Sequence, residues 1–265
     1  MKNLPTIEQL ISLRGKTALV TGAAGGIGKA MAHRFAEAGA TLELVDYNAA
    51  ALTVVADELA ALGTRVRTHV IDLADKEQID AMWDALDGEE PDILVNNAGI
   101  YPFRQFVDAD EAFVRRVMEI NLFSVSWMCH QMIRRRIKRG GVIINLGSIE
   151  AVLPFKDDLA LYSTSKAGVI ALTRALSKEH ARDGFRINAI LPGGILTPGT
   201  KAAAKEVLRG QFGHIKTGIE FKQRLPIGRI GQPDEVARMA LVLASDLASY
   251  VQGAAIPVDG GFLAA

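Results

Sequence analysis

Tyr162 and Lys166 stand four residues apart in a segment with helical spacing, so their side chains share one face of the predicted helix. A phenol has an ordinary pKa of about 10 and is a poor base at neutral pH. An adjacent ammonium group stabilises the phenolate and lowers the pKa of the phenol, and a base with a pKa nearer the working pH is more effective. The pair therefore predicts an acid/base catalyst that exchanges a proton with a hydroxyl group, with Tyr162 as the proton-transferring residue.

Two further polar residues accompany this pair. Ser148 follows a short apolar segment, Val142–Leu146, that predicts a buried strand. There its hydroxyl can hydrogen-bond a substrate oxygen and hold that oxygen near Tyr162. Asn121 lies inside a helical pattern, where asparagine is an unfavourable residue. We therefore expect Ser148, Tyr162 and Lys166 to form the catalytic site, to which the family resemblance described below adds Asn121.

The elements that must position these residues are short apolar segments that alternate with longer helical patterns. Such alternation predicts an α/β fold of the Rossmann type, a doubly wound parallel sheet of seven strands with helices on both faces. Ligands of such sheets bind at the carboxyl ends of the strands, where the unusual residues stand. The predicted strands are Thr17–Val20, Leu42–Val45, Val66–Ile71, Ile93–Val95, Val142–Leu146, Arg186–Leu191 and Ala255–Val258. The predicted helices are Lys29–Ala38, Ala49–Leu62, Asp75–Leu86, Asp110–Ile137 and Ala160–Ala181.

A glycine-rich loop, Thr21–Gly28, follows the first predicted strand and opens a helix. Glycines let the backbone turn tightly and approach a pyrophosphate, and the helix N-terminus supplies N–H donors and a favourable dipole. A glycine cluster by itself also suits an ordinary tight turn, but the strand–loop–helix context favours a dinucleotide site. The loop residues expected to contact the cofactor are Gly22, Gly26, Ile27 and Gly28.

Asp46 at the end of the second strand predicts which dinucleotide binds. A carboxylate there can accept hydrogen bonds from both ribose hydroxyls of an adenosine, and it would repel a 2′-phosphate. No Lys or Arg stands at Ala24, Gly25 or Tyr47 to receive such a phosphate. The sequence therefore predicts NAD rather than NADP as the cofactor.

Further cofactor contacts are expected after the third and fourth strands. Asp72 can accept a hydrogen bond from the adenine amino group, although an acid at a strand end can equally cap the next turn. Leu73 beside it is expected to contact the cofactor as well. Gly99 permits close approach of the adenosine, and Asn97 is expected to lie near the cofactor.

These motifs, taken in order, resemble those of the short-chain dehydrogenase/reductase family over nearly the whole chain, from about Gly15 to Phe262. Each motif alone could arise by chance, whereas all of them in this order are specific. They are the TGxxxGIG loop at Thr21–Gly28, then Asn96–Gly99, Asn121, Ser148, Tyr162–Lys166, Pro192–Gly193 and Pro257–Gly261. The resemblance implies hydride transfer between a nicotinamide cofactor and a secondary alcohol or ketone. It also implies a homotetramer.

The resemblance assigns roles to several residues. Lys166 is expected to reach the nicotinamide ribose hydroxyls, and Asn121 to kink its helix and hold a water molecule connected to Lys166. After the sixth strand, the backbone from Pro192 onward is expected to pair with the nicotinamide amide, with Ile195 close by. Thr197 is expected to bond the same amide or a phosphate.

One spacing departs from what is common in the family. Tyr162 stands 14 positions after Ser148, one more than usual. We expect the loop Leu153–Asp158 between them to accommodate the extra residue and to border the substrate pocket. A carboxylate such as Glu150 suits a polyol or sugar, whereas apolar neighbours suit a hydrophobic alcohol; we favour the polyol or sugar. The candidate pocket residues, which follow strand ends near the catalytic groups, are Tyr101, Glu150, Leu153, Phe155 and Ile195.

The regions outside the motifs give weaker expectations. Residues 15–265 are expected to form a single catalytic domain, with residues 1–14 as an extension that is either an arm on a neighbouring subunit or loosely ordered. The segment at about 197–222 predicts a flexible lid over the site. It contains Gly210, Gly213, Gly218 and His214, and the lone histidine is a substrate contact or, more commonly, a surface residue.

Composition excludes several other classes of protein. The 265 residues include 30 Lys+Arg and 30 Asp+Glu, so there is no basic surplus of the kind that nucleic-acid binding requires. The basic cluster Arg134–Arg139 stands at the end of a helical pattern, where cations complement the helix dipole, and this interpretation is favoured over a binding patch. No stretch approaches the ~20 apolar residues of a membrane helix. The single cysteine, Cys129, fits a reducing, cytoplasmic location, and no metal site is expected.

Two other functions compete with an NAD-dependent alcohol dehydrogenase. The first is an NADPH-dependent carbonyl or 3-oxoacyl reductase, against which Asp46 argues. The second is a non-catalytic dinucleotide-binding sensor on the same fold, since a fold alone does not prove a function. The complete set of catalytic residues argues against the sensor.

Overall fold

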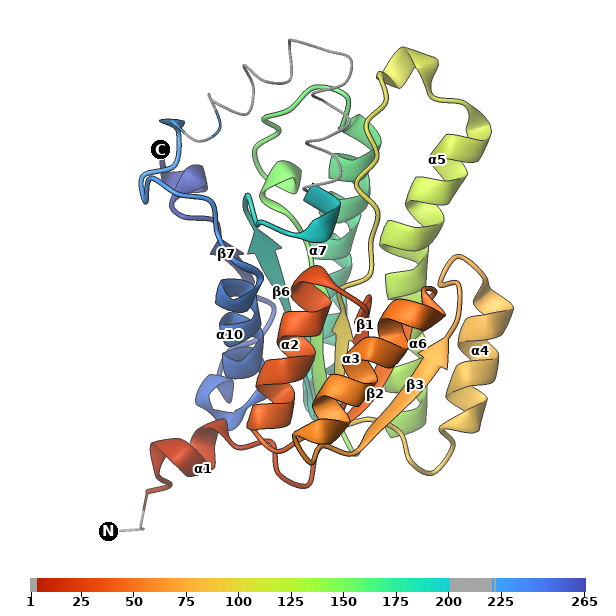
Figure 1. Ribbon diagram of the computed structural model, residues 1–265, viewed down its shortest axis with the longest axis vertical. Coiled ribbons are helices and arrows are strands. Elements are labelled where there is room, and N and C mark those ends of the chain that lie inside the picture. Colours follow the sequence, from red (N-terminus) through yellow and green to blue (C-terminus); the bar gives the residue numbers. More distant parts are fainter. Residues whose placement is uncertain (1–3, 201–220, 222) are drawn as a thin grey trace.

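The computed structural model describes residues 4–200, 221 and 223–265, which build a seven-stranded parallel sheet with helices on both faces (Figure 1). The strand order is β3-β2-β1-β4-β5-β6-β7, which confirms the predicted doubly wound fold. The chain proceeds outward in one direction from β1 and in the other from β4, so the boundary between them is the point where such sheets bind ligands. The strands are β1 Thr17–Thr21, β2 Thr41–Asp46, β3 Val66–Val70, β4 Ile93–Asn96, β5 Gly141–Leu146, β6 Phe185–Pro192 and β7 Ala255–Val258.

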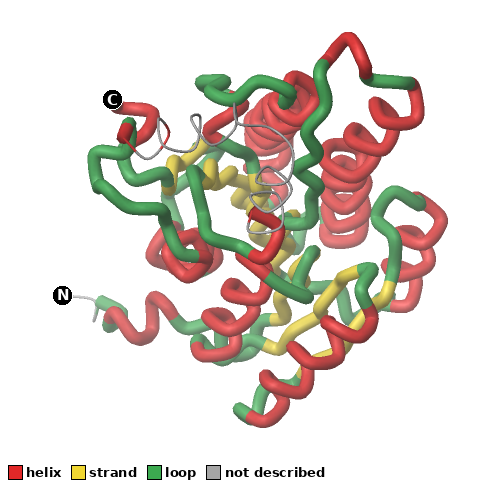
Figure 2. Tube along the Cα trace, turned by 45° about the horizontal axis from the view of Figure 1, so that its top comes forward, coloured by secondary structure: helices red, strands yellow, loops and turns green. Residues whose placement is uncertain are grey.

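Separate apolar clusters lie on the two faces of the sheet, because successive side chains of a strand point in opposite directions. In β1, Ala18 and Val20 belong to one cluster and Leu19 to the other. Figure 2 shows the strands in yellow between the two groups of helices. The first face is covered by α2 Gly26–Glu37, α3 Ala49–Ala61 and α10 Pro233–Ala244, and the second by α4 Lys76–Ala85, α5 Glu111–Met118, α6 Ser124–Arg136 and α7 Ala160–His180.

The predicted helix Asp110–Ile137 is interrupted at its centre. Residues Glu119–Phe123 form a π-helical turn between α5 and α6, so the backbone there takes more residues per turn than an α-helix. Asn121 lies in this turn and is fully buried. The structure thus locates the irregularity at the residue that the sequence singles out as a poor helix former.

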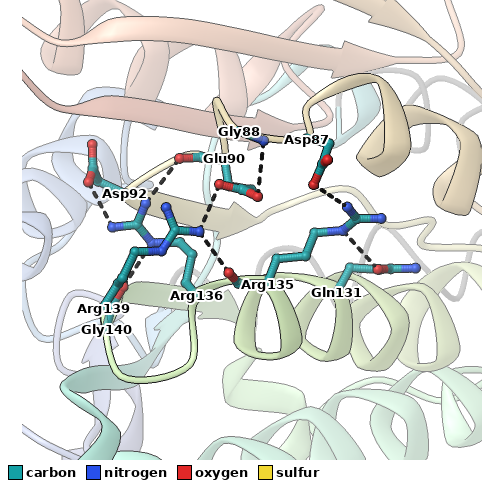
Figure 3. A network of polar contacts seen from close by, with 9 residues as sticks. All are labelled: Asp87, Gly88, Glu90, Asp92, Gln131, Arg135, Arg136, Arg139 and Gly140. Atoms are coloured by element: carbon teal, nitrogen blue, oxygen red, sulfur yellow. Dashed lines mark hydrogen bonds and ion pairs between the residues drawn. The ribbon is translucent and has the colours of Figure 1, made fainter.

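The basic cluster at the end of α6 pairs within the chain, as Figure 3 shows. Arg136 donates to the Asp92 carboxylate at 2.9 Å and to the Glu90 carbonyl oxygen at 3.1 Å. Arg139 donates to the Glu90 carboxylate at 2.8 Å, and Arg135 pairs with two nearby aspartates. These arginines fasten the end of α6 to the segment that leads into β4. The structural interpretation of the cluster is therefore favoured over a binding patch.

The described part of the N-terminal extension packs partly against the domain. A short helix, α1 Ile7–Ile11, is capped by Thr6, and Leu13 is buried in the first apolar cluster. The backbone N–H of Leu13 donates to the carbonyl oxygen of Ala38 at 2.8 Å. No helix in the described part of the chain combines the length and the apolar character needed to cross a membrane.

Candidate active site

The glycine loop between β1 and α2 has a shape that side chains would obstruct. Gly22 and Gly26 have φ values of +65° and +54°, in the left-handed region that favours glycine. A Cβ atom at Gly28 would lie 2.1 Å from the carbonyl oxygen of Gly22. α2 begins at Gly26 without a side-chain cap at Gly25, so its first N–H groups can bind an anion. These features fit the pyrophosphate of a dinucleotide.

Asn97, just after β4, holds the start of this loop in place. Its Nδ2 donates to the carbonyl oxygens of Thr21 at 2.9 Å and Gly22 at 3.2 Å. The Thr21 hydroxyl in turn accepts hydrogen bonds from the backbone N–H groups of Asn97 and Ala98, both at 3.0 Å. The adjoining ends of β1 and β4 are thereby locked together at the topological switch point.

The carboxylate of Asp46 lies where β2 ends, against the glycine loop. Its Oδ2 accepts a hydrogen bond from the backbone N–H of Ala24, and its Oδ1 accepts one from that of Asn48, each at 3.0 Å. Each oxygen keeps a second lone pair that can accept from a ribose hydroxyl. The position therefore fits the adenosine end of the cofactor.

Asp72 has other partners. Its Oδ1 accepts from the backbone N–H of Ala74 at 2.9 Å, and its Oδ2 pairs with Arg116 at 3.0 Å. Helix α4 is capped by Asp75, so Asp72 instead shapes the turn before that helix. Leu73 is buried in the second apolar cluster. Contact of Asp72 and Leu73 with a cofactor stays a prediction.

A cavity of about 510 Å³ opens at the carboxyl ends of β4, β5 and β6. That volume suits a small-molecule ligand. Ser148, Tyr162 and Lys166 all line it. The predicted cofactor residues on its wall are Ile27, Asn97, Gly99, Pro192, Ile195 and Thr197. Other predicted cofactor residues stand apart from the described lining: Gly22, Gly26, Gly28, Asp46, Asp72 and Leu73.

The catalytic residues meet on one wall of this cavity. Tyr162 and Lys166 lie one turn apart on α7, with the Lys166 Nζ atom 6.0 Å from the centroid of the Tyr162 ring. Lys166 donates a hydrogen bond to the carbonyl oxygen of Leu146 at 2.8 Å, which joins the helix to the end of β5. The side chains of Ser148 and Tyr162 are hydrogen-bonded to each other. Thus α7 and β5 together bring a phenol, a hydroxyl and an ammonium group to one place.

Burial shifts the pKa values of Tyr162 and Lys166. Burial raises the pKa of Tyr162 to about 12; the hydrogen bond with Ser148 lowers it, and the nearby Glu150 carboxylate raises it. Burial also lowers the pKa of Lys166 to about 8. The expectation that Lys166 brings the phenol pKa below its ordinary value does not hold here, because desolvation of the phenolate prevails. The raised pKa of Tyr162 favours the protonated phenol, whereas the lowered pKa of Lys166 disfavours its ammonium form.

Asn121 is not part of the described cavity lining, but it hydrogen-bonds the segments that form the wall. Its Oδ1 accepts from the backbone N–H of Ile100 at 2.8 Å, and its Nδ2 donates to the carbonyl oxygen of Ile100 at 3.0 Å and to Ser165 at 3.3 Å. A Cβ atom at Gly99 would lie 3.2 Å from its Oδ1. Asn121 therefore fixes the segment after β4 against α7, beside the catalytic pair. The water molecule expected between Asn121 and Lys166 stays a prediction.

The segment after β6 forms the wall opposite α7. Pro192, Ile195 and Thr197 all line the cavity. The Thr197 hydroxyl accepts from the backbone N–H of Thr200 at 3.1 Å, which holds this turn. A Cβ atom at Gly26 would lie 3.4 Å from the Thr197 methyl group, so Thr197 stands next to the glycine loop. This position fits contact with a phosphate near the nicotinamide.

Most of the predicted substrate-pocket residues line the cavity, but one does not. Tyr101, Glu150, Phe155 and Ile195 line the cavity, whereas Leu153 is not among its described lining and packs against an apolar cluster below it. The Tyr101 ring meets the Tyr162 ring edge-on, with centroids 4.7 Å apart. Among the lining residues that the sequence analysis did not single out are Phe103, Lys156, Phe221 and Ile230. Of these, Lys156 lies in the loop whose unusual length the sequence does reveal.

Most of the predicted lid, at about 197–222, lies outside the described residues. The same applies to Gly210, Gly213, Gly218 and His214.

Known proteins match this chain over most of its length. A family model described as enoyl-(acyl carrier protein) reductase matches residues 22–263. Galactitol 2-dehydrogenase (L-tagatose-forming) from Cereibacter sphaeroides is 39% identical over 254 residues, which cover 94% of this chain and 96% of that protein. The chain belongs to the short-chain dehydrogenase/reductase family.

Other members of the family extend this comparison. A 3-oxoacyl-[acyl-carrier-protein] reductase from Aquifex aeolicus is 35% identical over 95% of this chain and 98% of its own. A putative NAD(P)-dependent gluconate 5-dehydrogenase from Beutenbergia cavernae, solved with bound NADP, has a TM-score of 0.89 at 34% identity, covering 97% of this chain and all of that one (100%). A 7α-hydroxysteroid dehydrogenase solved with NADH has a TM-score of 0.86 at 34% identity, covering 97% and 98%.

Membership of the short-chain dehydrogenase/reductase family fixes the general chemistry. The chain is an oxidoreductase that acts on secondary alcohols or ketones as small-molecule substrates, and the family binds a nicotinamide dinucleotide. The glycine loop, with its left-handed backbone and uncapped helix start, fits such a cofactor on its own geometry.

Proposed function

We propose that this chain is an NAD-dependent dehydrogenase that interconverts a secondary alcohol of a polyol or sugar and the corresponding ketone. The observation that carries the proposal is the meeting of Ser148, Tyr162 and Lys166 on one cavity wall. A hydroxyl and a phenol that are hydrogen-bonded to each other can both reach a single substrate oxygen.

Each residue of the site has a different role in the proposed reaction. The nicotinamide, when bound, supplies the acceptor or donor of a hydride. In oxidation, ionised Tyr162 takes the hydroxyl proton of the substrate while the carbinol carbon gives up its hydride. In reduction, Tyr162 donates its proton to the carbonyl oxygen. Ser148 hydrogen-bonds that oxygen, Lys166 reaches the ribose hydroxyls next to the nicotinamide, and Asn121 keeps the surrounding backbone in place.

Asp46 supports NAD as the cofactor. Its carboxylate stands at the adenosine end, where it would accept from ribose hydroxyls and repel a 2′-phosphate. Several similar structures hold NADP or NADPH and one holds NADH, so the comparisons leave both nucleotides open. The proposal of NAD therefore rests on this carboxylate.

A polyol or sugar as the substrate is supported by the polar groups of the cavity. Glu150 is buried on its wall and can accept hydrogen bonds from several hydroxyls. The similarity to galactitol 2-dehydrogenase agrees with this substrate class.

A second candidate is an NADPH-dependent 3-oxoacyl or other carbonyl reductase. The apolar side of the cavity, formed by Phe155, Phe221 and Ile230, and the similarity to 3-oxoacyl reductases favour it. Asp46 argues against NADPH. A non-catalytic sensor would not need the complete set of catalytic residues.

We also propose a cytoplasmic homotetramer. Phe123 in the π-helical turn and Trp127 in α6 are 48% and 38% exposed, which suits contact with a second copy of the chain. Phe262 near the C-terminus is fully buried within its own chain, so it is not available for contact with another subunit. Light scattering would give the number of subunits.

The experiment that tests the function follows NADH absorbance during incubation with polyols, sugars, hydroxysteroids and simple secondary alcohols. We expect turnover with a polyol or sugar, and tighter binding of NADH than of NADPH in side-by-side titrations. Tyr162→Phe should nearly abolish turnover and leave NADH binding intact. Tighter NADPH binding would overturn the cofactor, and unchanged turnover of Tyr162→Phe would remove this residue from the mechanism.

A further inference from the structure

The loop between β5 and α7 brings an ammonium group to the substrate side of the cavity. Lys156 is half-buried on the cavity wall, and its Nζ atom lies 3.7 Å from the centroid of the Phe103 ring. The face of an aromatic ring attracts a cation, so Phe103 holds the ammonium group in position. Within the described residues Lys156 has no ion-pair partner, and Glu150 and Asp158 act on it only at longer range.

The loop is fixed on both sides of Lys156. Before it, the backbone N–H of Phe155 donates to the Glu150 carboxylate at 3.1 Å. After it, the carbonyl oxygen of Asp158 accepts from the backbone N–H of Arg104 at 3.0 Å. Asp158 itself has a φ of +68°, a left-handed conformation that costs energy and that aspartate tolerates better than most residues. These contacts hold the loop on both sides of Lys156.

We propose that Lys156 binds a carboxylate of the substrate, so that the substrate is a polyhydroxy acid instead of a neutral polyol. This inference rests on the proposed function and narrows its substrate class. Glu150 lines the same cavity as Tyr162 and Lys156 and acts electrostatically on both. The reacting hydroxyl is then held by Ser148 and Tyr162, an intermediate hydroxyl by Glu150, and the terminal carboxylate by Lys156.

The electrostatics favour an anion over a neutral hydroxyl at this position. Burial lowers the pKa of Lys156, which means that the ammonium form lacks part of the solvation it would have in water. A carboxylate restores this stabilisation because it adds the attraction between opposite charges to the hydrogen bond from the ammonium group. An alcohol group of a polyol would accept the same hydrogen bond but bring no charge.

The test measures binding of matched pairs of ligands by calorimetry. The enzyme loaded with NADH forms dead-end complexes with D-gluconate, D-glucitol, D-galactonate and galactitol, so no hydride transfer disturbs the titration. We expect an aldonate to bind at least about 10-fold more tightly than the alditol of the same configuration. Lys156→Met should remove this preference and leave alditol binding within about twofold. Lys156→Arg should retain most of it, because the charge is kept.

The matched control is Lys178→Met, which removes an exposed lysine on α7 away from the cavity and should leave the preference unchanged. If the wild-type enzyme shows no preference for the acids, or if the preference survives in Lys156→Met, the inference is wrong. It is equally wrong if Lys156→Met weakens acids and alditols alike, since that result would mean that Lys156 only holds the loop. If the proposed function itself were wrong, the ligands would still bind in the calorimeter, but no alcohol would reduce NAD in the absorbance assay.

Discussion

The carboxylate of Asp46 accepts a hydrogen bond from the backbone N–H of Ala24 at 3.0 Å, so the end of β2 is joined to the glycine loop. A second hydrogen bond, from the N–H of Asn48, holds the other carboxylate oxygen. The acid is therefore preorganised before a nucleotide arrives, and the ordering cost of binding is correspondingly smaller.

Replacing Asp46 by Ala should raise the KM for NAD at least about 10-fold, because hydrogen bonds to a charged acceptor contribute about 1.5–3 kcal/mol each. The KM for NADP should fall relative to that for NAD, since repulsion of the 2′-phosphate is removed. Initial rates with both cofactors give these values. Asp57→Ala, an exposed acid on α3, is the control for loss of charge. An unchanged NAD/NADP ratio in Asp46→Ala would contradict the assignment.

The pH dependence of alcohol oxidation should respond to Glu150. Burial raises the pKa of Tyr162 to about 12, and the negative charge of Glu150 adds to the rise. Oxidation needs the phenolate, so the rate increases as pH rises toward this pKa. Glu150→Gln removes the charge but keeps an acceptor for Phe155, and it should move the pH profile of kcat toward lower pH. Glu111→Gln, an exposed acid on α5, should leave the profile in place, and a shift to higher pH in Glu150→Gln would reverse our argument.

Two glycines of one loop should differ sharply when changed to Ala. At Gly28 the new Cβ would lie 2.1 Å from a backbone oxygen, whereas at Gly25 it would have no atom within 4 Å. Overpacking of this kind costs about 1–3 kcal/mol or more, so Gly28→Ala should lower the free energy of unfolding by that amount and weaken NADH binding. Gly25→Ala meets no such obstruction and should lower the free energy of unfolding by only about 1 kcal/mol, because Gly25 is the N-cap of α2, where glycine is preferred over alanine. Urea titrations of both variants measure this, and equal losses would refute the steric explanation.

Arg136 should be important for stability. Its side chain is only 11% exposed and bonds to Asp92, Glu90 and Gly140. Arg136→Met leaves the Asp92 carboxylate without this partner, and we expect a loss of about 3 kcal/mol in the free energy of unfolding. Arg115→Met, which breaks an exposed pair with Glu111, should cost less than about 1 kcal/mol. Similar losses in the two variants would show that burial of the network is unimportant.

The sequence predicts the sheet and the catalytic wall well, because both depend on local patterns. A buried parallel strand reads as an apolar run, and Tyr162 and Lys166 share a helix face through spacing alone. The helix predicted to begin at Lys29 begins three residues earlier in the structure, because α2 starts at Gly26 inside the glycine loop. Glycine is a poor helix former, so propensity conceals that start.

The substrate side of the cavity is harder to predict. Phe103, Lys156 and Phe221 come from three segments far apart in the sequence, and no periodicity relates them. The direction of Lys156 depends on the left-handed turn at Asp158 and on a hydrogen bond to Arg104, neither of which leaves a pattern in the sequence. The effect of burial on the pKa of Tyr162 leaves no pattern in the sequence for a similar reason, because the degree of burial is a property of the assembled fold.

The π-helical turn at Glu119–Phe123 has a consequence for the length of the chain. An α-helix advances about 100° per residue, and a π-helical turn, whose hydrogen bonds join residues i and i+5, takes in one residue more. Deleting one residue from this turn would let regular α-helical hydrogen bonding close across it, with buried residues of α6 such as Met128 and Met132 facing as before. The change would fall on Asn121, whose alignment with Ile100 depends on the wider turn. The extra residue of this turn is therefore one that the active site requires and that the packing of the two helices does not.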